Sequence, residues 1–144
     1  MIKIKELEKI YRTEEVETVA LNKLSFEVKS GEFVAVMGPS GCGKSTLLNI
    51  LGMLDDPDAG SFLFNGIEVA HFNERKRADL RKHNIGFVFQ SFNLIPVLTV
   101  IENVEIPLLL NKKVNDKERR QIAEKSLVDV GLGDYINSSP NKLS

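Results

Sequence analysis

Residues 38–46 read "GPSGCGKST", and they lie between two apolar runs, "FVAVM" at 33–37 and "LLNIL" at 47–51. The segment matches the pattern of a glycine, four residues, glycine-lysine and then serine or threonine. Backbone N–H groups converge on an anion only where the chain curls tightly, and glycines permit such a curl. The sequence therefore predicts a phosphate-binding loop between a buried strand at 33–37 and a helix. The alternative is a glycine-rich turn that holds nothing.

Two residues that follow the glycines supply charge and a metal ligand. A helix beginning near Lys44 aims its unpaired N–H groups and the positive end of its dipole at a phosphate. Lys44 adds a full positive charge, and the Ser45 hydroxyl is placed to ligate Mg²⁺. We therefore predict a nucleoside triphosphate and Mg²⁺ as ligands, with Lys44 as a catalytic residue and Ser45 as a metal ligand. The predicted nucleotide contacts in the loop are Gly38, Pro39, Ser40, Gly41, Cys42, Gly43, Lys44, Ser45 and Thr46.

The composition is that of a globular chain with no bulk affinity for nucleic acid. The 144 residues are 42% hydrophobic and 27% charged, with a net charge of −1. The single cysteine, Cys42, cannot form an internal disulfide, which favours the reducing cytoplasm. Since no apolar run approaches the roughly 18–20 residues of a membrane helix, we expect any membrane contact to be made through a partner.

The N-terminal part of the chain carries the periodicity of strands. "MIKIKELEKIY" at 1–11 and "VALNKLSFEV" at 19–28 alternate apolar and polar residues, which predicts an antiparallel pair. Asn65-Gly66 between two apolar runs predicts a hairpin, and "NIGFVFQ" at 84–90 is another short β-type run. Strands mixed with helices indicate an α/β fold.

After residue 99 the sequence carries the pattern of helices. Thr99 is placed to cap a helix, and Asn115 with a glutamate three residues later predicts the start of a helix over 116–130. The expected apolar face of that helix is Ile122, Ala123, Leu127 and Val130, and Gly131 is the expected stop. We expect one domain with two parts, a nucleotide-binding core at 1–90 and a helical part at 91–144.

The stretch "IGFVFQSFNLIPVLTVIENVEIPL" at 85–108 resembles the glutamine-loop region of ATP-binding cassette transporter subunits. Together with "GPSGCGKSTLLNILGMLDDPDAGSFLFNG" at 38–66, it is most similar to ATPase subunits of the lipoprotein-releasing and macrolide-exporting branch. The resemblance implies a P-loop ATPase core with an N-terminal antiparallel β portion and a partial helical subdomain.

The resemblance also implies two site residues outside the loop. Tyr11 would stack on adenine, and Gln90 would be a catalytic residue that reaches Mg²⁺ and the attacking water. The alternatives are that Tyr11 packs on the core and that Gln90 is a surface amide. The apolar segment "SFNLIPVL" at 91–98 would dock a membrane subunit or pack under the helical part, and the basic run at 74–83 is expected to be a solvated helix face.

The implied function is energy coupling for a membrane transporter. MgATP would draw two ATPase subunits together, and an integral-membrane permease at the inner face of the cell membrane would use that motion for export or lipoprotein release. Leu143 and Ser144 would begin the family's signature motif, and the later hydrolytic residues lie beyond them, so the chain is expected to bind nucleotide without efficient hydrolysis. The alternatives are a mechanical or division-associated ATPase, a binding module without turnover, and an unrelated phosphate-loop kinase.

Overall fold

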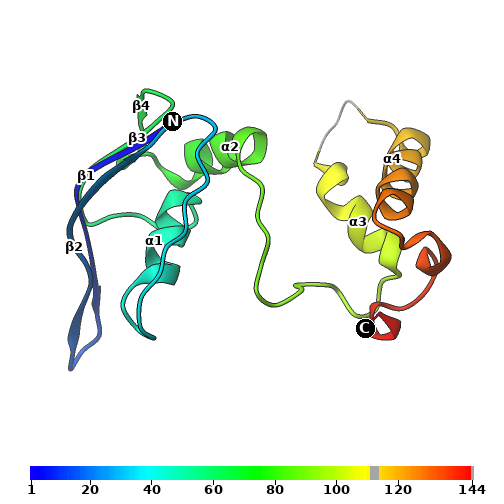
Figure 1. The fold of residues 1–144 in the computed structure, drawn as a ribbon, viewed down its shortest axis with the longest axis horizontal. Helices are drawn as coiled ribbons and strands as arrows, with labels where there is room; N and C mark the ends of the chain where they lie inside the picture. Colours follow the sequence, from blue (N-terminus) through cyan, green and yellow to red (C-terminus); the bar gives the residue numbers. More distant parts are fainter. Residues whose placement is uncertain (111–113, 144) are drawn as a thin grey trace. The chain divides into compact units, whose positions relative to one another are not determined.

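The computed structural model describes residues 1–110 and 114–143, which fold as two compact units, Met1–Val88 and Phe89–Ser144 (Figure 1). The first unit contains a sheet of four strands: β1 (Ile2–Arg12), β2 (Glu17–Val28), β3 (Ala59–Phe64) and β4 (Ile67–Glu68). Their order is β2-β1-β3-β4, and every neighbouring pair is antiparallel. The predicted antiparallel pair at the start of the chain is therefore confirmed.

The predicted hairpin at Asn65-Gly66 joins β3 to β4. Both residues have positive φ, 49° and 81°, which is the conformation that a two-residue turn between twisted strands requires. The Asn65 side chain also accepts a hydrogen bond of 2.6 Å from the amino group of Met1. The hairpin therefore holds Met1, the residue before β1, as well as turning the chain.

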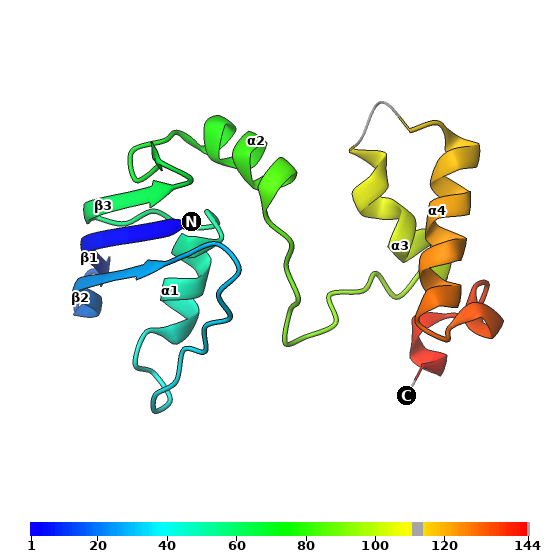
Figure 2. The ribbon, with the colours of Figure 1, turned by 45° about the horizontal axis from the view of Figure 1, so that its top comes forward.

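Two helices complete the first unit, α1 (Lys44–Leu51) and α2 (Glu74–Asn84). In Figure 2, α1 lies along one face of the sheet. The buried core of the first unit contains apolar side chains from β1, β2, β3, α1 and the segments that follow α1 and β4: Ile4, Leu7, Leu21, Leu47, Ile50, Met53, Phe62, Val69 and Ala70. This packing fixes the N-terminus of α1, and hence the glycine-rich loop, against the sheet.

The basic run at 74–83 forms α2, and part of it is structural. Arg77 is buried and pairs with Asp56 and Glu74. Arg81 donates to the backbone oxygen of Met53 and also pairs with Glu74. The expectation of a purely solvated face is therefore wrong for these two arginines, because they anchor α2 to the segment that follows α1.

The predicted buried strand at 33–37 is not formed, and neither is the β-type run at 84–90. Phe33 is 98% exposed, Met37 is 88% exposed, and Val88 is fully exposed. A strand that is apolar on both faces is stabilised only when neighbouring strands pair with it and helices cover it. Among the described residues, neither segment pairs with a strand of the antiparallel sheet. Both segments are apolar as the prediction requires, but the described sheet has no strand that pairs with them.

The second unit contains α3 (Val100–Leu109), α4 (Asp116–Asp129) and two short 3₁₀ helices, η1 (Gly133–Tyr135) and η2 (Pro140–Lys142). Both long helices begin with a capping box, formed by Thr99 with Glu102 and by Asn115 with Glu118. These reciprocal bonds satisfy N–H groups that a helix start leaves without partners. Both predicted helix starts are confirmed.

A small core joins α3 to α4 and buries Val100, Ile101, Ala123 and Leu127. The prediction of a helix over 116–130 is right to within one residue, and Gly131 follows it with φ of 77°. Ile122 and Val130 are exposed, so the buried face of α4 is narrower than predicted.

Candidate phosphate-binding site

The glycine-rich loop ends directly in α1. Residues 38–43 form turns and irregular backbone, and Lys44, Ser45 and Thr46 form the first turn of the helix. Gly43 occupies the capping position with φ of 90°, and no side chain accepts a hydrogen bond there. The first N–H groups of a helix have no partner within the helix, and the dipole adds positive potential at this end. The start of α1 is therefore suited to an anion.

Gly43 is also where the loop touches the sheet. A Cβ at this position would lie 2.3 Å from the backbone oxygen of Ala20 and 3.3 Å from the Leu21 side chain, both on β2. The contact leaves no room for any side chain larger than hydrogen. The sheet therefore sets the position from which α1 begins.

The Lys44 side chain folds back onto the loop. Its ammonium donates to the backbone oxygens of Gly38 and Pro39 at 2.9 and 2.6 Å, and it lies 3.7 Å from the sulfur of Cys42. These acceptors are neutral, whereas phosphate oxygens are charged and form stronger bonds with an ammonium. Lys44 therefore holds positive charge at the loop and can transfer its donors to an incoming phosphate.

A cavity of about 260 Å³ lies beside the loop. It is lined by residues of β2, of the 33–37 segment, of the loop and of α1: Ala20, Leu21, Asn22, Leu24, Val36, Met37, Cys42, Gly43, Lys44 and Leu47. A second hollow, of about 340 Å³, lies at the tip of the β1–β2 hairpin and is lined by Thr13, Glu14, Glu15 and Val16. Two glutamates make that hollow unsuitable for a phosphate, so the cavity at the loop is the candidate site.

The protein oxygens at the loop suit Mg²⁺ only when the phosphates of a nucleotide supply further ligands. Among the described residues, no group of three or more His, Cys, Asp or Glu side chains is arranged to hold a metal ion. Mg²⁺ in nucleotide sites is held by one or two protein oxygens together with substrate phosphates and water. The Ser45 hydroxyl on the first turn of α1 is a suitable protein oxygen of this kind.

Tyr11 lies on β1 and is 42% exposed, outside the buried core of the first unit. Its hydroxyl donates to a carboxylate oxygen of Asp55 at 2.9 Å, and the Lys9 ammonium lies 5.3 Å from the centre of its ring. Sequence reasoning missed both neighbours. The signals were the two-residue spacing of Lys9 and Tyr11, which puts them on one face of a strand, and the acidic pair that follows α1.

Gln90 belongs to the second unit and is exposed, so its membership of the same site stays a prediction. Residues 91–97, which follow it, are also exposed, with Phe92 and Val97 nearly fully so. Asn103 of α3 holds the segment through the backbone of Ile95, whose N–H donates to the Asn103 side chain at 2.7 Å. The backbone of the segment is thus bound to α3, while most of its apolar side chains are exposed.

The family profile described as "ABC transporter" matches residues 21–144. The chain belongs to the ABC transporter family. Its fold is the P-loop ATPase fold of that family, with an N-terminal antiparallel sheet and helices. No helix of the described residues is long and apolar enough to cross a membrane.

Relatives of this ABC transporter chain include ATP-binding proteins and larger fusions. It is 52% identical over 136 residues, 94% of its length, to an uncharacterized ABC transporter ATP-binding protein from Thermotoga maritima, of which it covers 58%. It is 42% identical, over its whole length, to the macrolide export ATP-binding/permease protein MacB from Syntrophobacter fumaroxidans, of which it covers 20%.

Among solved structures, the ABC cassette MJ0796 is similar over the whole chain. The structure described as a dimeric post-hydrolysis state of MJ0796 bound to ADP and Pi superposes with a TM-score of 0.89 at 42% identity. The chain spans 63% of MJ0796 and a comparable share of the separate ATP-binding relatives, so its fold is partial relative to theirs.

Proposed function

We propose that this chain is the MgATP-binding part of an ABC transporter ATPase subunit. The observation that carries the proposal is the loop at 38–46, which leads into the uncapped start of α1 and carries the Lys44 ammonium. The ADP and Pi bound to the MJ0796 relative, which is 42% identical, support a nucleotide as the ligand.

Each residue of the site has a defined task in this proposal. The N–H groups of residues 41–46 bind the outer phosphates, and Lys44 exchanges its carbonyl acceptors for phosphate oxygens. Ser45 holds Mg²⁺, which when bound neutralises charge that develops on the phosphates. Tyr11 offers its ring to the base, and Gln90 orients the attacking water.

The proposed partners are a second ATPase subunit and an integral-membrane permease, with the ATPase at the inner face of the cell membrane. The dimeric structures of MJ0796 support the first, and the ATP-binding/permease names of the MacB relatives support the second. The exposed apolar segment 91–98 is a suitable surface for a permease, because an apolar patch rimmed by polar residues favours protein contact. The transported cargo is proposed as an exported small molecule or a lipoprotein.

The 144 residues are proposed to bind nucleotide with little turnover. Hydrolysis requires a group that takes the proton of the attacking water as well as one that orients it, and the loop supplies mainly electrostatic stabilisation of the departing phosphate. Titration calorimetry with MgATP and a phosphate-release assay test both parts of this proposal. The assays compare the 144-residue chain with a chain extended to the length of the relatives.

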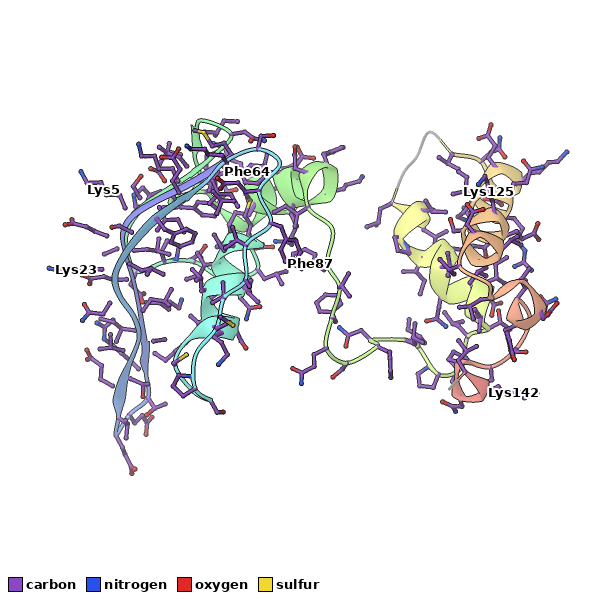
Figure 3. All side chains as sticks on the ribbon, in the orientation of Figure 1. Lys5, Lys23, Phe64, Phe87, Lys125 and Lys142 are labelled. Carbon is purple, nitrogen blue, oxygen red and sulfur yellow. The ribbon has the colours of Figure 1, made fainter. Side chains whose placement is uncertain are left out.

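Lys44→Ala is the test variant, and Lys5→Ala is its control, because Lys5 is an exposed lysine of β1 that points away from the rest of its unit (Figure 3). We expect Lys44→Ala to weaken MgATP binding on the order of 10- to 100-fold, the effect of losing bonds to a charged group. Lys5→Ala should bind as the unmodified chain does. Equal binding by both variants would contradict the proposal, as would phosphate transfer to an acceptor, which indicates a kinase.

A further inference from the structure

Three side chains form a closed network between β1 and the segment that follows α1. One carboxylate oxygen of Asp55 accepts from the Tyr11 hydroxyl at 2.9 Å, and the other accepts from the Lys9 ammonium at 2.9 Å. Lys9 is buried and also donates to the backbone oxygen of Asp56 at 2.7 Å. Asp55 therefore neutralises a buried cation and at the same time holds the polar end of Tyr11.

The backbone of this segment keeps Asp55 in place. The N–H groups of Leu54 and Asp55 donate to the backbone oxygen of Asn49 in the last turn of α1, at 2.8 and 3.3 Å. Further along, Asp58 accepts from the N–H of Ile10 at 2.6 Å. The segment is thus tied to α1 at one end and to β1 at the other, so the Asp55 carboxylate is fixed relative to both.

We propose that Asp55 is a positioning residue for nucleotide binding, which holds the Tyr11 ring in the orientation that receives the base. The inference rests on the proposed function, in which Tyr11 stacks on adenine, and adds what fixes that ring. A tyrosine ring that is 42% exposed otherwise turns about its side-chain bonds and loses that freedom when a base stacks on it. With the hydroxyl held by Asp55, most of this ordering is complete before the ligand arrives.

The network also determines which part of Tyr11 is available to a base. Because the phenol proton is donated to Asp55, Tyr11 presents the face of its ring to a base and has no free donor. Base stacking on an aromatic face is tolerant of the base identity. The contribution of Asp55 therefore depends on the presence of a base and is independent of the phosphates.

The test compares two ligands, MgATP and Mg-tripolyphosphate, which has the phosphates without a base. Asp55→Ala and Tyr11→Phe each remove the same hydrogen bond, and Tyr11→Phe leaves the Lys9 pair intact. We expect each variant to bind MgATP about three- to tenfold more weakly, and to bind Mg-tripolyphosphate as the unmodified chain does. The double variant should be no weaker than either single variant, because both changes break one interaction.

Asp58→Ala is the matched control, since Asp58 lies in the same segment and binds β1 through the N–H of Ile10, whereas Asp55 binds the Tyr11 hydroxyl. It should leave the ratio of the two affinities unchanged, whatever its effect on stability. An equal loss for both ligands in Asp55→Ala, no loss for either, or additive single effects would overturn the inference. If the unmodified chain binds MgATP in a Lys44-dependent way while Asp55→Ala is neutral, only this inference fails. If the unmodified chain binds neither ligand, the proposed function fails with it.

Discussion

Replacing Gly43 by alanine tests how the sheet positions the loop. Its φ of 90° is a left-handed conformation that costs an alanine about 1–2 kcal/mol. The new Cβ would also lie 2.3 Å from the backbone oxygen of Ala20, so β2 or the loop must move, at a further cost of about 1–3 kcal/mol. We expect Gly43→Ala to lower the free energy of unfolding by about 2–5 kcal/mol.

Two other glycines provide matched controls, because alanine at either position would have the same backbone strain without a clash of its Cβ. Gly41 and Gly66 both have φ of 81°, and a Cβ at either would meet no atom within 4 Å. Each alanine variant should therefore lose only the about 1–2 kcal/mol of backbone strain. Gly41 lies in the loop and Gly66 in the β3–β4 turn, so only Gly41→Ala should also weaken MgATP binding.

Thermal unfolding followed by circular dichroism measures the stabilities, and calorimetry measures the binding. With about 4–8 °C of melting temperature per kcal/mol for a unit of this size, Gly43→Ala should melt at least about 4 °C below both controls. Equal melting temperatures for all three variants would refute the packing argument. Equal MgATP affinities for Gly41→Ala and Gly66→Ala would refute the placement of the phosphates at the loop.

Three further outcomes are expected. Burial raises the pKa of Glu68, but bonds from the Ser61 hydroxyl and two backbone N–H groups outweigh it and lower that pKa below 4.5. The stability from these bonds is therefore present above pH 4.5 and is lost as the pH falls through the lowered pKa. On acidification, the free energy of unfolding of Glu68→Gln should therefore fall less steeply than that of the unmodified chain. Thr99→Ala removes the α3 capping box and should cost about 1 kcal/mol in urea unfolding, with a loss near zero arguing against the cap. Alkylation of the exposed Cys42, followed by mass spectrometry, should block nucleotide binding and be slowed by MgATP, and full binding by the alkylated chain would contradict the site.

Local signals in the sequence were sufficient wherever a few neighbouring residues decide the structure. The Asn65-Gly66 turn and the helix caps at Thr99 and Asn115 depend on backbone dihedrals and on bonds three residues apart, so the turn and the caps appeared as predicted. The phosphate-loop spacing likewise placed Lys44 at the first turn of a helix.

Sequence reasoning failed where the outcome depends on distant partners. The 33–37 run has the composition of a buried strand, but a strand forms only beside another strand, and the described sheet provides none for it. The ion pair between Lys9 and Asp55 joins residues 46 positions apart. The spacing of Lys9 and Tyr11 indicates that these two residues share a face, but no local pattern pairs either of them with Asp55, so that partner is found only in the fold.

The central claim is that backbone N–H groups before and within the first turn of α1 bind the phosphates of a nucleotide. Amide chemical shifts of the ¹⁵N-labelled chain, recorded as MgATP is added, measure those groups directly. We expect the largest shifts at residues 41–46, in amides that also respond to Mg-tripolyphosphate. Shifts confined to other segments, or none at saturating MgATP, would contradict the claim.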